Sequence, residues 1–101
     1  MSETEIIGTY RTMRTELKNI ADKINELEMD YNEHVRVLET ISPLNASRKA
    51  FRLVGDILVE RSVGEIMPAL SSNKESLQKV IMTLTSSLNE KEKVANVYQV
   101  F

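Results

Sequence analysis

Side chains that could do acid–base or metal chemistry are few and scattered in this sequence of 101 residues. His34 is the single histidine, and there is no cysteine. A metal site needs several converging ligands, and the spacing around His34 supplies no such group. Asp56 and Glu60 form a close carboxylate pair beside a predicted turn, where carboxylates are usually solvated. We therefore expect no catalytic residue, no metal and no cofactor.

Other classes of function are disfavoured by what the sequence lacks. It contains no nucleophile–base grouping and no glycine-rich phosphate loop, so an enzyme is not expected. Lys and Arg number 13 against 15 Asp and Glu, which leaves no basic surface for nucleic acid or anionic membranes. The acidic start Met-Ser-Glu-Thr-Glu does not resemble a secretory signal, and no apolar run approaches the ~20 residues of a membrane-spanning helix. We expect a soluble, cytoplasmic protein.

The first half of the chain carries a heptad pattern of apolar residues, here called the first seam. Its spacing alternates between four and three without interruption, which predicts a coiled-coil helix over about residues 5–42. Pro43 ends this helix, because the residue before a proline is disfavoured in the α region. His34 is the one seam position that is not apolar, and we interpret it as a polar residue that sets the coiled-coil register. The first seam consists of Ile6, Tyr10, Met13, Leu17, Ile20, Ile24, Leu27, Tyr31, His34, Leu38 and Ile41.

A second heptad pattern occupies the carboxyl-terminal part. Residues 62–65 read Ser-Val-Gly-Glu, a capping box that predicts a short helix over about 63–69, which Pro68 kinks or ends. A second capping box, Ser72-Asn-Lys-Glu75, predicts the start of another helix over about 73–99. The second seam consists of Leu77, Ile81, Leu84, Leu88, Lys91, Ala95 and Tyr98. Two heptad helices joined by a reversing connection are predicted to pair in antiparallel fashion.

Between the helices lies a predicted β-hairpin over about residues 50–62. Bulky apolar residues flank Gly55-Asp56, a glycine-first dipeptide that suits a two-residue turn with Val54 opposite Ile57. Both faces are apolar near the turn, and a two-stranded hairpin is at best marginally stable alone. Its open edges invite strands from other chains. The candidate assembly residues are Phe51, Leu53, Val54, Gly55, Ile57, Leu58 and Val59.

These elements predict a mostly α fold in one domain, residues 1–101: a long antiparallel coiled-coil helical hairpin with a single β-hairpin at its closed end. Antiparallel pairing brings the two ends of the chain together, and both ends are apolar. Exposed apolar patches usually mark interaction sites. The alternative is that these residues only zip the last helical turns together. The tip residues are Ile6, Ile7, Tyr10, Val97, Tyr98, Val100 and Phe101.

Four segments together resemble the β-type prefoldin subunits. They are Asn32-Glu-His34, the hairpin over residues 51–61, Pro68-Ala-Leu70 and Asn73-Lys-Glu75, so the resemblance covers nearly the whole chain. It implies a helix, a β-hairpin and a returning helix, with the hairpin built into a double β-barrel platform of six α-type and β-type subunits.

The resemblance also implies a function. Family members capture unfolded polypeptides, such as actin and tubulin, between the coiled-coil tips and deliver them to the cytosolic chaperonin without nucleotide. By position, the tip residues would be the client contacts of this chain. The alternative that stays open is an antiparallel coiled-coil adaptor, which assembles other proteins and never binds unfolded chains.

Overall fold

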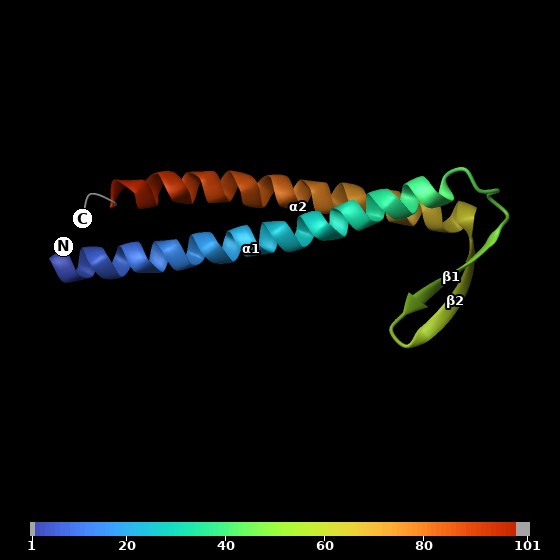
Figure 1. Ribbon diagram of the computed structural model, residues 1–101, viewed down its shortest axis with the longest axis horizontal. Coiled ribbons are helices and arrows are strands. Elements are labelled where there is room, and N and C mark those ends of the chain that lie inside the picture. The colour runs from blue at the N-terminus through green and yellow to red at the C-terminus, as the bar shows by residue number, and fades with distance from the viewer. Residues whose placement is uncertain (1, 99–101) are drawn as a thin grey trace. The chain divides into compact units, whose positions relative to one another are not determined.

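The computed structural model describes residues 2–98, which form two helices and one β-hairpin (Figure 1). In chain order the elements are α1 (Glu3–Ile41), β1 (Lys49–Val54), β2 (Ile57–Ser62) and α2 (Val63–Val97). This confirms the predicted fold class of two helices with one antiparallel hairpin between them. The chain divides into two compact units, which are described separately. The first unit contains residues 2–28 and 79–98, and the second unit is Met29–Gln78.

Helix α1 follows the predicted heptad closely. It begins with a capping box: the Ser2 hydroxyl accepts the Glu5 backbone N–H at 3.2 Å and donates to the Glu5 carboxylate at 3.0 Å. Every residue of the first seam is buried or half-buried, and Leu17 and Ile24 are only 7% exposed. The helix ends at Ile41, two residues before the proline that was predicted to stop it.

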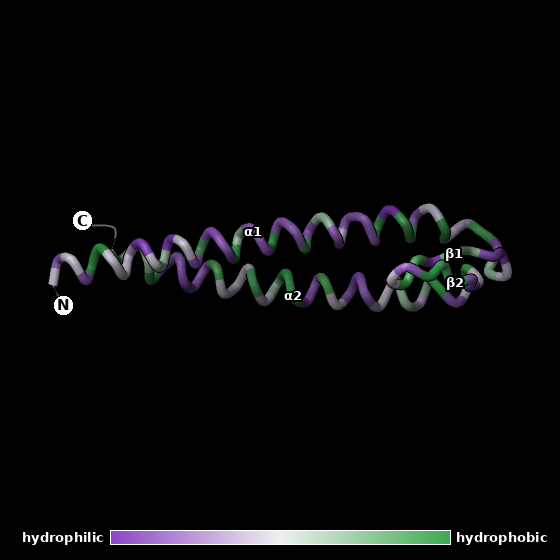
Figure 2. The backbone as a smooth tube through the Cα atoms, turned by 90° about the horizontal axis from the view of Figure 1, so that it is seen from below, coloured by the Kyte–Doolittle hydropathy of each residue, from purple (hydrophilic) through white to green (hydrophobic). Residues whose placement is uncertain are grey.

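In the first unit the two helices run antiparallel. Glu16 of α1 lies 3.8 Å from the Lys91 amine of α2, and Arg14 donates to the Asn96 side chain at 3.3 Å. An earlier residue of α1 therefore meets a later residue of α2, as antiparallel pairing requires. Ala95, which lies between Lys91 and Asn96 in the sequence, is completely buried. Figure 2 shows apolar residues recurring along both helices, as expected for a heptad pattern.

The predicted break in the second helical region is wrong. Helix α2 is continuous from Val63 to Val97, with Pro68 inside it, so residues 63–69 and 73–99 are not separate helices and Ser72 caps nothing. Pro68 lies in the second turn of α2, where its missing N–H removes one helical hydrogen bond. Its side chain is exposed. The second seam also continues upstream without a slip. Its additional members are Val63, Met67, Leu70 and Lys74, all buried or half-buried.

A short loop joins α1 to the hairpin in the second unit. The Asn45 side chain accepts the Ser47 backbone N–H at 2.9 Å, which forms a local turn. The loop also contacts the start of α2, because the N–H of Val63 donates to the Arg48 carbonyl at 2.9 Å. Val63 is 1% exposed and forms the centre of this junction. The capping box predicted at Ser62 is confirmed: its hydroxyl accepts the Glu65 N–H at 3.3 Å.

The β-hairpin has the predicted register. Val54 pairs with Ile57, Leu53 with Leu58, and the two strands run antiparallel. Gly55 has a φ of 60°, whereas Asp56 keeps a negative φ, as in a type II′ turn. Glycine adopts this left-handed conformation without steric cost. Neither helix, over the residues that the structure describes, has an apolar stretch long enough to cross a membrane.

Candidate functional site

The hairpin exposes an unusual amount of apolar side chain. Phe51, Leu53, Val54, Ile57 and Leu58 are between 56% and 69% exposed. They come from both strands and, because side chains alternate along a strand, from both faces of the sheet. An apolar face on each side of a two-stranded sheet is typical of a surface that another protein covers. Of the remaining predicted assembly residues, Val59 is half-buried and Gly55 forms the turn.

Both edges of this sheet are open, since the described part of the chain contributes two strands to it. In a hairpin with a two-residue loop, the residues that flank the loop exchange both backbone hydrogen bonds. Val54 and Ile57 are this pair, so every second residue from them points its N–H and C=O inward. The bond from the Val63 N–H to the Arg48 carbonyl agrees with this alternation, because Arg48 is six residues before Val54 and also points its carbonyl inward. Phe51 and Leu53 therefore direct their backbone groups toward the free edge of β1.

Five of the predicted tip residues are described in the first unit, and they form a half-buried group and an exposed group. Ile6, Tyr10 and Tyr98 are half-buried, as expected for members of the two seams. Ile7 is 38% exposed and Val97 is 72% exposed, so these two present apolar surface to solvent. The other two tip residues, Val100 and Phe101, lie outside the described residues.

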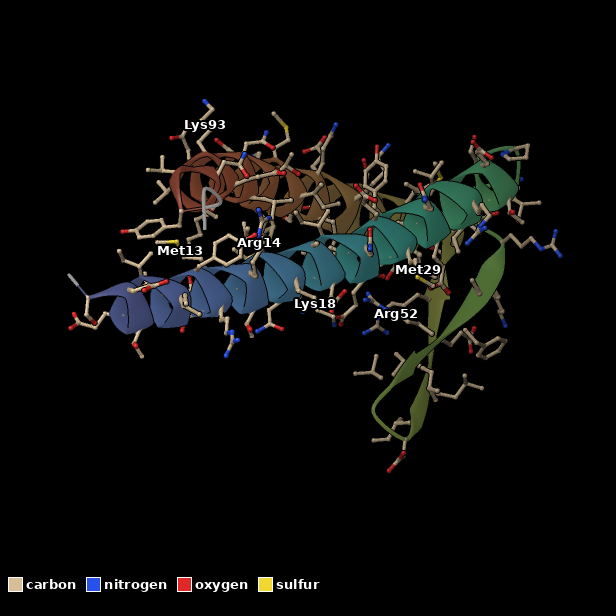
Figure 3. All side chains as sticks on the ribbon, turned by 60° about the vertical axis from the view of Figure 1, so that its left-hand side comes forward. Met13, Arg14, Lys18, Met29, Arg52 and Lys93 are labelled. Atoms are coloured by element: carbon tan, nitrogen blue, oxygen red, sulfur yellow. The ribbon has the colours of Figure 1, made fainter. Side chains whose placement is uncertain are left out.

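Sequence reasoning missed a polar contact beside the tip. Arg14 donates from Nε to the Tyr10 hydroxyl at 2.9 Å, and its guanidinium carbon lies 5.1 Å from the centre of the Tyr10 ring. The same side chain donates to Asn96 of α2 at 3.3 Å. In Figure 3 Arg14 reaches from α1 toward α2, whereas Lys93 projects away from α1. The four-residue spacing of Tyr10 and Arg14 was a usable signal for the first contact.

A hollow in the first unit is the second feature that the sequence did not predict. It has a volume of about 220 Å³ and lies next to the Glu16–Lys91 ion pair. Met13 and Val94 supply its apolar wall, and Glu90 completes its lining. An open hollow of this size offers room for a single apolar side chain rather than for an enclosed ligand.

The side chains that could take part in acid–base or metal chemistry do not come together in one site. The Nδ1 atom of His34 lies 2.8 Å from the Asp30 carbonyl oxygen four residues earlier, so that nitrogen acts as the donor. Glu60 lies 3.5 Å from the Lys49 amine, and both side chains are at least half exposed. Among residues 2–98 no cluster of three or more His, Cys, Asp or Glu could hold a metal ion.

These features define a class of protein: chains in which a β-hairpin with exposed apolar faces connects two heptad helices. The family model described as "Prefoldin subunit" matches residues 4–100. The chain is 42% identical over 99 residues to prefoldin subunit 2 of Homo sapiens and of Bos taurus, covering 98% of this chain and 64% of each relative. It is 35% identical over 96 residues to the probable prefoldin subunit 2 of Dictyostelium discoideum, covering 95% of this chain and 83% of that relative.

Among solved structures, the crystal structure of the prefoldin beta subunit from Thermococcus strain KS-1 has the same fold. The TM-score is 0.85 at 13% identity, over 96% of this chain and 85% of that chain. The chain belongs to the prefoldin subunit family, which confirms the resemblance drawn from the hairpin and its flanking residues. It spans 64% of the length of the human and bovine relatives.

Proposed function

We propose that this chain is a non-enzymatic subunit of a hetero-oligomeric prefoldin that binds unfolded polypeptides. The observation that carries the proposal is the hairpin, whose two apolar faces and two open edges lie exposed. Membership of the prefoldin subunit family supports the same role. Nothing in this role needs a nucleotide, a metal or another cofactor.

Assembly through the hairpin has a hydrophobic driving force. Fully burying one large apolar side chain contributes about 1.5–3 kcal/mol, and five such side chains on the hairpin are more than half exposed. Strand addition at the free edges supplies backbone hydrogen bonds and fixes the register. The partners in this proposal are α-type and other β-type prefoldin subunits, which complete the sheet that this chain leaves open.

Client binding is assigned to the tip residues of the first unit. Ile7 and Val97 expose apolar surface, and the half-buried Ile6, Tyr10 and Tyr98 adjoin the same chain ends. Weak apolar contacts from several subunits act together, so that avidity replaces a deep pocket. Clients of the actin and tubulin kind would then pass to the cytosolic chaperonin in the cytoplasm, without nucleotide.

Replacing Leu58 by Asp tests assembly. The change places a charge on an apolar face that the partner must bury, so the variant is expected to keep its helical circular dichroism but to form no hexamer with α-type prefoldin subunits. The control is Met82→Asp, which makes the same kind of change at a similarly exposed residue of α2, 65% against 63%. Multi-angle light scattering measures both. A hexamer of normal mass with Leu58→Asp contradicts the proposal.

A second experiment separates a chaperone from an adaptor. The complex reconstituted with α-type subunits is mixed at near-equimolar ratio with chemically denatured actin, and aggregation is followed by light scattering. The chaperone role predicts that aggregation is delayed. A complex that assembles normally but leaves aggregation unchanged would instead be a coiled-coil adaptor.

A further inference from the structure

The two faces of the hairpin differ in charge. The strand register places Phe51, Leu53, Leu58 and Glu60 on one face together with Lys49, whose amine lies 3.5 Å from the Glu60 carboxylate. Positive and negative charge therefore balance on this face. The opposite face, here called the arginine face, consists of Ala50, Arg52, Val54, Ile57, Val59 and Arg61. It carries two cations and no carboxylate.

The two arginines are diagonal neighbours across the strands, because Arg52 pairs with Val59 and Arg61 lies two residues further along β2. Arg61 has a distant carboxylate from α2, with its Nε atom 4.0 Å from Glu65. Arg52 makes no ion pair within 4.0 Å to any residue among 2–98. Its side chain projects from the hairpin in Figure 3. Assembly would bring this unpaired charge into an interface.

The backbone phase determines what would lie opposite Arg52 at the free edge of β1. Arg52 directs its N–H and C=O toward Val59, so toward the free edge it occupies a non-hydrogen-bonded position. In an antiparallel pair, residues at such positions have Cα atoms about 4.5 Å apart, closer than at hydrogen-bonded positions. The side chain opposite Arg52 is therefore its nearest partner, and opposite charges at such a position are stabilising.

A second copy of this hairpin cannot supply that charge by antiparallel pairing. Non-hydrogen-bonded positions face one another, and in this hairpin the residues with inward backbone groups are the members of the arginine face. Any antiparallel register therefore places an arginine-face residue of the copy opposite Arg52. None of these residues is acidic, and two are arginines. Self-pairing leaves the charge unpaired or sets like charges against each other.

We propose that the free edge of β1 pairs with a strand of a different chain that carries Asp or Glu directly opposite Arg52. On that strand the residues two positions before and after the acid face Ala50 and Val54, so they are apolar. The partner strand thus has the pattern apolar–any–acidic–any–apolar. This inference rests on the proposed assembly function and names the chemistry of its partner. Charge complementarity then selects a different subunit over a second copy of this one.

Charge reversal at Arg52 tests the inference with α-type prefoldin subunits as the probe. Arg52→Glu is expected to raise the Kd of the assembly about tenfold, and changing the opposing acid of the partner strand to Arg is expected to restore it. Arg48→Glu is the control, since Arg48 is exposed and lies just before β1. Its hydrogen bonds are made by the backbone, whose carbonyl accepts from Val63 and whose N–H donates to the Asn45 carbonyl, so the Kd of the Arg48→Glu variant should stay within twofold of wild type.

The outcomes distinguish this inference from the assembly function. If Arg52→Glu assembles like wild type while Leu58→Asp does not, the inference of an acidic residue opposite Arg52 is wrong and the assembly role stands. If Leu58→Asp also assembles, the assembly role itself fails. A strand-paired homodimer of the wild-type chain, seen by sedimentation and lost in Leu58→Asp, overturns the selection against self-pairing.

Discussion

Gly64 donates its backbone N–H to the Ala46 carbonyl oxygen at 2.9 Å, so the loop before β1 lies directly against the first turn of α2. A Cβ atom on Gly64 would lie 3.3 Å from both the Cβ and the carbonyl oxygen of Ala46. A side chain at position 64 would therefore require Ala46 to shift by a few tenths of an ångström.

Enlarging Gly64 is expected to destabilise the second unit. Gly64→Val adds three carbons against Ala46, and overpacking of this kind costs about 1–3 kcal/mol in the free energy of unfolding. Gly8→Val is the matched control, because a Cβ at Gly8 meets nothing within 4 Å. Thermal unfolding followed by circular dichroism compares the two. Equal melting temperatures for both variants would contradict the close approach to Ala46.

Replacing Pro68 by Ala is expected to stabilise the protein. The N–H that alanine restores can donate to the Gly64 carbonyl, and the ring no longer crowds the preceding turn. Because Pro68 lies inside a continuous helix and is exposed, we expect a gain of about 1–3 kcal/mol in chemical denaturation. A loss of stability would show instead that the packing of α2 depends on the proline.

The Glu16–Lys91 contact in the first unit is expected to contribute modestly. Its atoms lie 3.8 Å apart and both side chains are about half exposed, so the pair is worth about 0.2–1 kcal/mol. Glu16→Lys should lower stability by that order, and adding Lys91→Glu should recover it. High salt, near 1 M, should remove the difference between these variants. Failure of the double variant to recover at low salt would count against a direct ion pair.

A charge at the tip is expected to impair client binding without affecting assembly. Val97→Asp removes exposed apolar surface from the proposed client contacts, so suppression of actin aggregation should fall several-fold. Met29→Asp is the control, since both residues are 72% exposed but Met29 lies in the other unit. Light scattering reports aggregation, and complex mass verifies assembly. Equal suppression by both variants would remove Val97 from the client site.

The hairpin and the helix packing could be predicted because their signals are local and periodic. The four-and-three spacing identified Leu17, Ile24 and Ala95 as core positions, since a helix repeats its faces at that interval. Gly55 identified the turn, because few residues tolerate its positive φ. Pro68 misled the prediction, since a local helix-breaking tendency can be outweighed by a seam that continues on both sides of it.

By itself, therefore, the sequence determined the two heptad helices, the hairpin register and the family to which the chain belongs. Only the tertiary structure decided which distant groups meet. Arg14 reaches Asn96 across 82 positions, and Gly64 lies against Ala46, contacts that no spacing along one element encodes. It also decided that the hairpin faces stay exposed, because burial depends on what packs against a strand and not on the strand's own residues.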